Sequence, residues 1–93
     1  GWSDVETWDS LYDVSRHDKH GNAILSGNVF TYDSSNCLVV TPNDNSKTVV
    51  LEGLDGYIVA ASNDTLMVCR REHEEMVFKF ASDVELKKVI DKK

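Results

Sequence analysis

The sequence predicts a mainly β fold with helical structure at each end. Short runs of β-branched and aromatic residues recur roughly every 8–11 residues, which is typical of strands joined by tight turns. Apolar residues before and after these runs recur instead at intervals of three and four, which indicates helices. The expected strands are 29–32, 38–41, 48–51, 57–60 and 66–69.

Length and charge limit what such a domain can do. The chain has 93 residues, 41% of them hydrophobic and 28% charged, as is typical of one small soluble domain. A domain of this size buries about 60–65% of its unfolded surface, which leaves little room for a deep catalytic cleft. The net charge of −6 argues against nucleic acid or an anionic membrane as a partner. No stretch approaches the roughly 18 apolar residues of a membrane span.

The first helix is predicted to start near residue 3. Ser3-Asp4-Val5-Glu6 has the S-x-x-E form of a capping box, in which two side chains accept backbone N–H groups at a helix start. An apolar stripe follows at helical spacing: Val5, Trp8, Leu11 and Tyr12. We expect this stripe to pack against the strands, and the turn at His20-Gly21-Asn22 to end the segment.

Turn-forming residues separate the expected strands. Asp, Asn, Ser and Gly are frequent at 33–36, 42–45, 53–56 and 62–64. The strands do not alternate cleanly between apolar and polar residues, so both faces of a sheet could be covered. A meander, a small sandwich and a β-solenoid all fit this spacing. A regular hexapeptide repeat is absent, because the register from Ile24 and Phe30 continues with Asn36 and Pro42.

The last segment, 72–93, is predicted to be helical. Its apolar positions are Met76, Val77, Phe80, Leu86, Val89 and Ile90. A second S-x-x-E pattern at 82–85 interrupts them, which leaves open whether the segment is one helix or two. The terminal Lys92 and Lys93 suit the negative end of a helix dipole.

Few side chains are arranged for chemistry. His17 and His20 could share a helical face, but no paired cysteine motif accompanies them, so solvated histidines are expected rather than a zinc site. Arg70 and Arg71 could bind an anion, yet the acids within 72–75 explain them more simply through local neutralisation. The sequence has no nucleophile elbow, phosphate-binding glycine loop or H-E-x-x-H pattern. We therefore expect no catalytic residue within this chain.

The two cysteines indicate a reducing environment. Cys37 and Cys69 each lie in an apolar run, as buried thiols do, and one possible pair is not a disulfide framework. Reduced thiols and a cytoplasmic location are expected. Gly1 stands where an initiating Met would be, and we expect the chain to be cut from a longer protein.

The first twelve residues carry the most specific motif. Gly1-Trp2-Ser3-Asp4-Val5-Glu6-Thr7-Trp8-Asp9-Ser10-Leu11-Tyr12 resembles the G-W-S-D-V-G-S-W-D-x-L-[WY] stretch of bacterial mannose-1-phosphate guanylyltransferases. In that family the stretch closes the nucleotidyltransferase domain and leads into a C-terminal β-helix domain. Weaker similarity continues in the family's order at 21–22, 27–29, 35–39, 50–60 and 64–69, over about three-quarters of the chain.

This resemblance implies an architecture that spacing alone leaves open. It implies an irregular left-handed β-helix-like domain of short strands, with an N-terminal helix and a C-terminal helical segment. Residues 1–18 would then be the helical end of the nucleotidyltransferase domain and a linker. Residues 19–71 would form the β-helix-like domain, and 72–93 the C-terminal helical segment.

The resemblance also implies an activity for a longer parent protein. The family joins GTP and mannose 1-phosphate to give GDP-mannose and pyrophosphate, normally with Mg²⁺. Its glycine-rich nucleotide loop and most substrate-binding residues belong to the N-terminal domain, so the 93 residues alone are expected to be inactive and to bind no cofactor. Their implied role is to brace that catalytic domain and to assist homodimer formation.

One residue of the implied metal site lies in this chain. Asp4 aligns with the family aspartate that helps to hold the metal, and a carboxylate is the kind of ligand that Mg²⁺ prefers. A simpler interpretation is that Asp4 is a first-turn acid favoured by the helix dipole. Glu6 replaces the family glycine, which puts the local backbone geometry in question. Trp2 and Trp8 are expected to be packing anchors rather than substrate platforms.

Two other functions stay open on the sequence. The chain could be a stand-alone β-rich binding or assembly module without activity, in keeping with its lack of catalytic motifs. Alternatively, the parent could be a sugar-nucleotide pyrophosphorylase for another sugar or base, because the residues that select the substrate lie elsewhere. The sequence also leaves open whether an isomerase domain follows Lys93.

Overall fold

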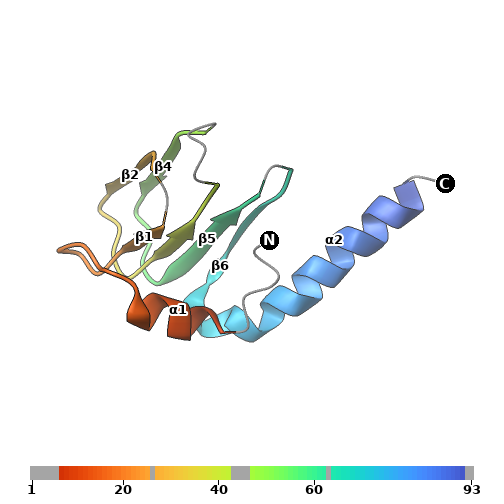
Figure 1. Ribbon diagram of the computed structural model, residues 1–93, viewed down its shortest axis with the longest axis horizontal. Coiled ribbons are helices and arrows are strands. Elements are labelled where there is room, and N and C mark those ends of the chain that lie inside the picture. The colour runs from red at the N-terminus through yellow and green to blue at the C-terminus, as the bar shows by residue number, and fades with distance from the viewer. Residues whose placement is uncertain (1–6, 26, 43–46, 63, 92–93) are drawn as a thin grey trace.

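The computed structural model describes residues 7–25, 27–42, 47–62 and 64–91. The elements in order are α1 (Trp8–Val14), β1 (Ala23–Leu25), β2 (Val29–Tyr32), β3 (Leu38–Val40), β4 (Val49–Glu52), β5 (Tyr57–Ala61), β6 (Leu66–Arg70), the 3₁₀ helix η2 (Arg71–Met76) and α2 (Val77–Asp91). The strands form a β-rich body, α1 lies across one end of it, and α2 projects away from that end (Figure 1). None of the described helices combines the length and apolar character needed to cross a membrane.

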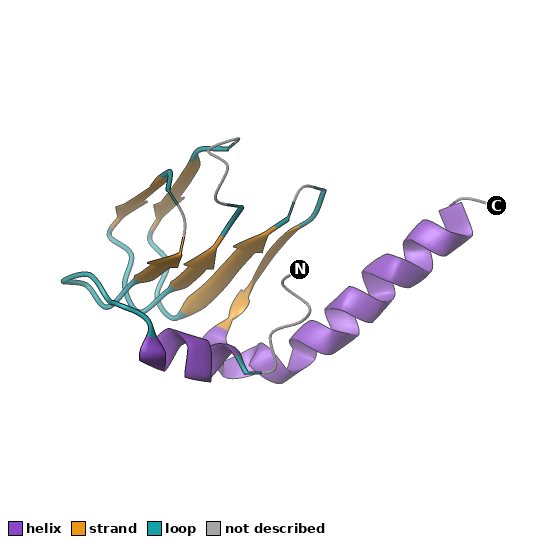
Figure 2. Cartoon of the chain, viewed as in Figure 1, coloured by secondary structure: helices purple, strands orange, loops and turns teal. Residues whose placement is uncertain are grey.

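Strands that are not consecutive in sequence pair in parallel. In the first sheet the order is β1-β3-β5-β6, with the first three strands parallel and β6 antiparallel to β5. In the second sheet β2 pairs in parallel with β4. Each parallel partner is therefore two strands further along the chain, so the chain alternates between two sheets and stacks each turn on the one before (Figure 2).

The backbone turns the same corner ahead of β1, β3 and β5. Ala23, Leu38 and Ile58 occupy equivalent positions in the three strands. The residue two positions before each of them has a positive φ: 81° at Gly21, 57° at Asn36 and 74° at Gly56. A second corner follows β2 and β4, at Asp33 (φ 50°) and Gly53 (φ 75°). Gly, and to a lesser degree Asn and Asp, adopt this left-handed conformation most readily. The expected turns at 33–36 and 53–56 therefore set the coil of the chain.

The first sheet is buried on both faces. Its outer face packs against α1 and the start of α2 in a cluster of Trp8, Tyr12, Ala23, Leu38, Ile58, Ala60, Met67, Cys69 and Val77. Its inner face meets the second sheet in a smaller cluster of Cys37, Val39, Leu51 and Val59. This two-sided burial explains why the sequence of β3 and β5 does not alternate between apolar and polar residues.

The predicted strands and flanking helices are present, but the described residues form a mixed α/β fold rather than a mainly β one, because α1, η2 and α2 are together longer than the short strands. All five expected strands are present as β2 to β6, with bounds within one residue of the prediction. The sequence pattern does not predict β1, because its three residues are too few to give a strand signal. This strand is held instead by pairing with β3.

The predicted start of the first helix is wrong. The N-cap of α1 is Thr7, in an extended conformation with no side-chain cap hydrogen bond, and Trp8 is the first helical residue. The capping-box pattern at 3–6 lies outside the described residues and does not begin α1. The acceptor for the first turn comes from elsewhere in the chain, since the backbone N–H of Asp9 donates to Glu74 Oε2.

The second capping-box pattern does not begin a helix either. Ser82-Asp83-Val84-Glu85 lies inside α2, which runs without interruption from Val77 to Asp91. An ion pair of 3.0 Å between Lys79 Nζ and Asp83 Oδ2 ties Asp83 to the preceding turn instead. The C-terminal segment is therefore one α-helix preceded by η2.

Candidate functional site

A polar hollow lies where α1 meets the ends of the strands. Its volume is about 470 Å³, and its lining comes from α1, the corner before β5, and the end of β6 with the start of η2. The lining residues are Asp9, Asp55, Gly56, Tyr57, Arg70, Arg71 and Glu72. Three carboxylates outnumber two guanidinium groups, so the hollow does not present the excess of positive charge that an anion site needs.

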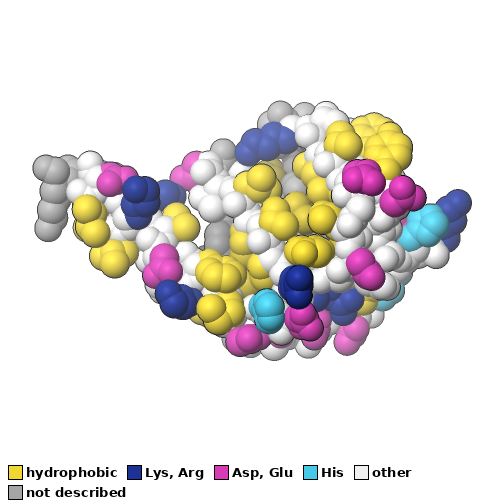
Figure 3. Space-filling view, turned by 180° about the vertical axis from the view of Figure 1, so that it is seen from behind, with side chains coloured by type: hydrophobic (Ala, Val, Ile, Leu, Met, Phe, Trp, Pro, Cys, Tyr) yellow, Lys and Arg dark blue, Asp and Glu magenta, His cyan; other side chains and the backbone are white. Residues whose placement is uncertain are grey.

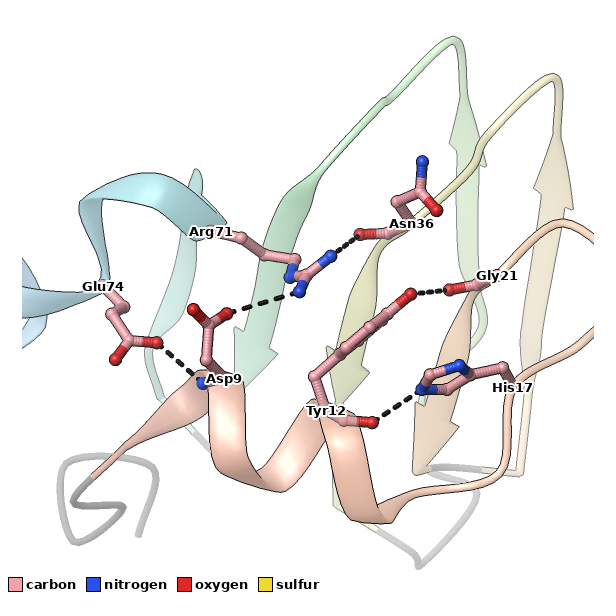
Figure 4. Close-up of polar contacts among 7 residues, drawn as sticks. All are labelled: Asp9, Tyr12, His17, Gly21, Asn36, Arg71 and Glu74. Carbon is pink, nitrogen blue, oxygen red and sulfur yellow. Dashed lines mark hydrogen bonds and ion pairs between the residues drawn. The ribbon is translucent and has the colours of Figure 1, made fainter.

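Arg71 is the residue through which this hollow connects α1 to the strands. Its Nη2 lies 3.4 Å from Asp9 Oδ1, and its Nη1 donates to the backbone carbonyl of Asn36 at 3.0 Å (Figure 4). The guanidinium carbon stands 3.6 Å from the centre of the Tyr12 ring, a cation–π contact. The side chain is only 23% exposed, and its Nε–H has no acceptor among the described residues. One side chain thus contacts α1 twice and the corner before β3 once.

Glu74 contacts the backbone at the N-terminal end of the same helix, α1. Its Oε2 accepts the backbone N–H of Asp9 at 2.7 Å, across 65 residues of sequence (Figure 4). The first N–H groups of a helix have no partner within the helix, and the Thr7 side chain supplies none. Glu74 therefore serves as a capping side chain for α1 from η2.

The far end of α1 is tied to the first corner. The Tyr12 hydroxyl donates to the Gly21 carbonyl at 2.5 Å, and His17 Nε2 lies 2.6 Å from the Tyr12 carbonyl oxygen. The His17 ring also stacks on the Tyr12 ring with centroids 4.2 Å apart (Figure 4). His17 is exposed, as predicted for a solvated histidine, and these contacts also tie it to Tyr12. The described residues contain no group of three or more His, Cys, Asp or Glu placed to hold a metal ion.

A buried amide completes the first corner. Asn22 is 1% exposed; its Nδ2 donates to the Ser34 carbonyl at 2.9 Å, and its Oδ1 accepts the Cys37 N–H at 3.0 Å. Asp18 Oδ1 accepts the backbone N–H groups of Asn22 and His20 at 3.0 and 2.8 Å. Desolvation opposes the charge on Asp18, but these hydrogen bonds outweigh it and lower its pKa.

The charged run at 70–75 divides into two parts with different partners. Arg70 pairs with Glu72 at 3.4 Å, which confirms local neutralisation for that residue. Arg71 pairs instead with Asp9, 62 residues away. Asp9 and Glu74 are therefore junction residues that the sequence did not single out, whereas Arg71 was considered only as part of an anion site. Arg71 and Glu74 lie in a short mixed-charge run beside a strand end, and Asp9 carries no comparable signal.

Of the two tryptophans predicted to be packing anchors, only Trp8 lies within the described residues. Trp8 is 2% exposed and lies in the main core, as predicted for a packing anchor. Its Nε1–H has no acceptor among the described residues. Trp2 and the predicted metal ligand Asp4 lie outside the described residues.

Both cysteines are buried free thiols. Burial raises the pKa of the Cys69 thiol, and the nearby charges of Glu75 and Glu74 add to the increase. A raised pKa leaves less of the reactive thiolate at neutral pH, which fits a structural role.

Known proteins that are similar to this chain point to one family. No family model matches. The alginate biosynthesis protein AlgA of Pseudomonas syringae pv. tomato is 39% identical over 72 residues, which is 77% of this chain and 14% of that protein. The mannose-1-phosphate guanylyltransferase of Klebsiella pneumoniae is 35% identical over 78 residues, 84% of this chain and 16% of that protein.

A solved structure gives the same relationship. A crystal structure of a protein described as mannose-1-phosphate geranyltransferase, from Thermus thermophilus, superimposes with a TM-score of 0.70 at 25% identity. The match covers 85% of this chain and 23% of that one. The chain thus spans only about a seventh to a quarter of the length of these relatives. By sequence and by fold, it is a homologue of the C-terminal part of mannose-1-phosphate guanylyltransferases.

Proposed function

We propose that this chain is part of an enzyme that joins GTP and mannose 1-phosphate to form GDP-mannose and pyrophosphate. The observation that carries the proposal is similarity over 84% of the chain to proteins named mannose-1-phosphate guanylyltransferase, at 35% identity. In this reaction a phosphate oxygen of mannose 1-phosphate attacks the α-phosphorus of GTP. The bond from that phosphorus to the bridging oxygen breaks, and pyrophosphate leaves.

The chemistry is assigned to a domain that precedes these residues. That domain would hold the nucleotide and the sugar phosphate, and the residues described here would support it. The packing of α1 favours this role, because Trp8 and Tyr12 are buried against the strands. A short helix fixed in this way can set the position of the chain that enters it.

Asp4 is the residue of this chain that we assign to the metal site. Its carboxylate is the hard oxygen ligand that Mg²⁺ prefers, and it stands three residues before the N-cap of α1. Bound Mg²⁺ would neutralise charge that develops on the phosphates. The role of Asp4 would be to hold this ion beside the reacting phosphates.

The proposal also includes the type of β fold, the oligomeric state and the location of the protein. We infer that the two parallel ladders are turns of an irregular left-handed β-helix, in keeping with the repeated positive-φ corner before β1, β3 and β5.

A homodimer is inferred from apolar side chains at the surface of β4, β6 and the projecting end of α2, among them Val50, Leu66 and Ile90. A cytoplasmic location is inferred from the two free thiols.

The test is an assay of the longer protein that contains this chain. Purified protein would be supplied with GTP, mannose 1-phosphate and Mg²⁺, and pyrophosphate release would be measured. Asp4→Ala should lower turnover by at least tenfold and raise the Mg²⁺ concentration needed for half of the maximal rate. Asp13→Ala is the matched control, because Asp13 is an exposed acid on α1 with no described partner.

The outcomes separate the parts of this proposal. An active protein whose rate and Mg²⁺ dependence survive Asp4→Ala would remove Asp4 from the metal site. A protein that uses another sugar phosphate or nucleotide, but not GTP with mannose 1-phosphate, would change the substrates and keep the reaction type. Absence of any nucleotidyl transfer would contradict the enzymatic proposal.

A second candidate function is a self-contained binding or assembly module. An apolar groove of about 570 Å³ between β4 and β6 favours it, with Val50, Leu66 and Val68 among its lining residues. Figure 3 displays hydrophobic side chains at the surface of the β-rich body and on the projecting helix. Sequencing the reading frame upstream of Gly1 distinguishes the two candidates. A start codon close to Gly1 would favour the module, and a long α/β segment with a glycine-rich loop would favour the enzyme.

A further inference from the structure

The first turn of α1 is held by side chains from η2, more than 60 residues later in the chain. A helix of seven residues is too short to be stable alone in water, so its direction depends on the contacts it makes. At its N-terminal end the described contacts come from η2: Glu74 accepts the Asp9 N–H, and Arg71 reaches the Asp9 carboxylate. Both side chains are partly shielded from solvent.

Arg71 also connects this turn to the coil of strands. Its second terminal nitrogen donates to the Asn36 carbonyl, and its backbone N–H donates to the Gly56 carbonyl at 2.8 Å. Asn36 and Gly56 are the positive-φ residues of two stacked corners. The residue that holds α1 is therefore anchored on two stacked corners of the β-rich body.

We propose that Arg71 and Glu74 are positioning residues, which fix the direction of α1 on the β-rich body and thereby how this chain is joined to the proposed catalytic domain. This inference rests on the proposed function, because Asp4 stands only three residues before the N-cap Thr7. Neither residue touches substrate or metal in this scheme. They act through α1, which transmits the position of the β-rich body to the catalytic domain.

The contacts assign different requirements to the two residues. Arg71 must supply a planar, forked group that bonds to two oxygens and covers the Tyr12 ring, which the ammonium of Lys cannot do. Glu74 must supply an acceptor oxygen, which Gln also has. Arg71→Lys should therefore lose function as Arg71→Met does, whereas Glu74→Gln should keep it.

The experiment uses the full-length protein with two measurements. The first is steady-state kinetics at varied Mg²⁺ for Arg71→Met, Arg71→Lys, Glu74→Ala and Glu74→Gln. Displacement of a catalytic group by about 1 Å can cost up to about 100-fold in rate, so kcat should fall about 10- to 100-fold in the first three variants. The Mg²⁺ concentration for half of the maximal rate should rise severalfold in the same variants.

The second measurement is hydrogen exchange of peptides that cover residues 8–14. Exchange should speed up at least tenfold in Arg71→Met and Glu74→Ala while peptides from β3 and β5 keep their protection. Lys79→Met and Glu75→Ala are matched controls. Lys79 pairs with the exposed Asp83 on α2, and Glu75 is exposed with no described hydrogen bond. Both controls should behave like the wild type in the two measurements.

The two measurements keep the proposals apart. A wild-type protein without activity would contradict the proposed function alone, and the exchange measurement would still decide whether Arg71 and Glu74 hold α1. Unchanged exchange in α1 would overturn the inference. So would variants that lose protection equally in α1, β3 and β5, or a Glu74→Gln variant as impaired as Glu74→Ala.

Discussion

A Cβ atom on Gly21 would lie 2.7 Å from Asn36 Oδ1, at the corner where the first turn of the coil meets the second. Gly21 also has a φ of 81°, which costs any residue with a side chain roughly 1–2 kcal/mol. Gly21→Ala therefore combines backbone strain with a contact that the Asn36 side chain must leave. We expect the free energy of unfolding to fall by about 2–3 kcal/mol, measured by urea denaturation.

Gly56→Ala is the matched control for this prediction. Its φ is 74°, but a Cβ atom there would meet nothing within 4 Å, so only the backbone strain of about 1–2 kcal/mol applies. Equal losses in the two variants would mean that the Asn36 side chain moves aside without cost.

Most of the strand pattern could be predicted because it is local. Runs such as 57–60 are rich in β-branched residues and end at Gly, Asn or Asp, whose conformational preferences do not depend on distant parts of the chain. The three residues of β1 carry no such signal, and their strand exists because Leu38–Val40 pairs with them. The order of strands likewise depends on pairing between turns, which spacing alone leaves open.

The junction at α1 could not be predicted for the same reason. Asp9 and Arg71 are 62 residues apart, and the acids that follow Arg71 offered closer partners. The S-x-x-E pattern indicates a local cap near residue 3, whereas Glu74 caps α1 across 65 residues. Tertiary contacts replace local signals at this site, so the residue types can be read from the sequence but their pairing cannot.

Asn22 should be essential for stability because it satisfies two buried backbone groups. Asn22→Leu would leave the Ser34 carbonyl and the Cys37 N–H without their side-chain partner. Each unsatisfied buried group costs about 1–3 kcal/mol, so we expect a loss of about 2–4 kcal/mol in thermal or urea unfolding. Asn28→Leu is the control, because its half-buried side chain has no described hydrogen bond. A loss no larger than that of the control would show that water replaces the amide.

The contact between Asp64 and Lys88 should make stability depend on pH in the acid range. Lys88 Nζ donates to Asp64 Oδ2 at 2.8 Å and, together with Thr65, lowers the pKa of Asp64 to about 2. A pKa lower in the folded than in the unfolded chain contributes stability above about pH 4, which is lost as the pH falls towards 2. Lys88→Met should return the pKa of Asp64 towards 3.8 and flatten this part of the stability curve.

The measurement is an NMR titration of the Asp64 carboxyl group, combined with unfolding between pH 2 and 5. Lys87→Met removes the same charge from the next position, where the partner is Asp91 at 3.6 Å. This control should leave the pKa of Asp64 unchanged. An Asp64 that titrates near 3.8 in the wild type would contradict the predicted link between α2 and the turn before β6.

Trp8 tests whether the core or the indole N–H matters more at α1. The side chain is 2% exposed, so Trp8→Ala should lower the free energy of unfolding by about 3–5 kcal/mol. Trp8→Phe keeps most of the apolar volume and removes an N–H that has no acceptor among the described residues, so its loss should be about 1–2 kcal/mol. Val14→Ala, on the same helix at 83% exposure, should change stability by less than about 0.5 kcal/mol. If Trp8→Phe costs as much as Trp8→Ala, the indole must donate to an acceptor outside the described residues. That result would make the hydrogen bond, rather than apolar burial, the main attachment of Trp8.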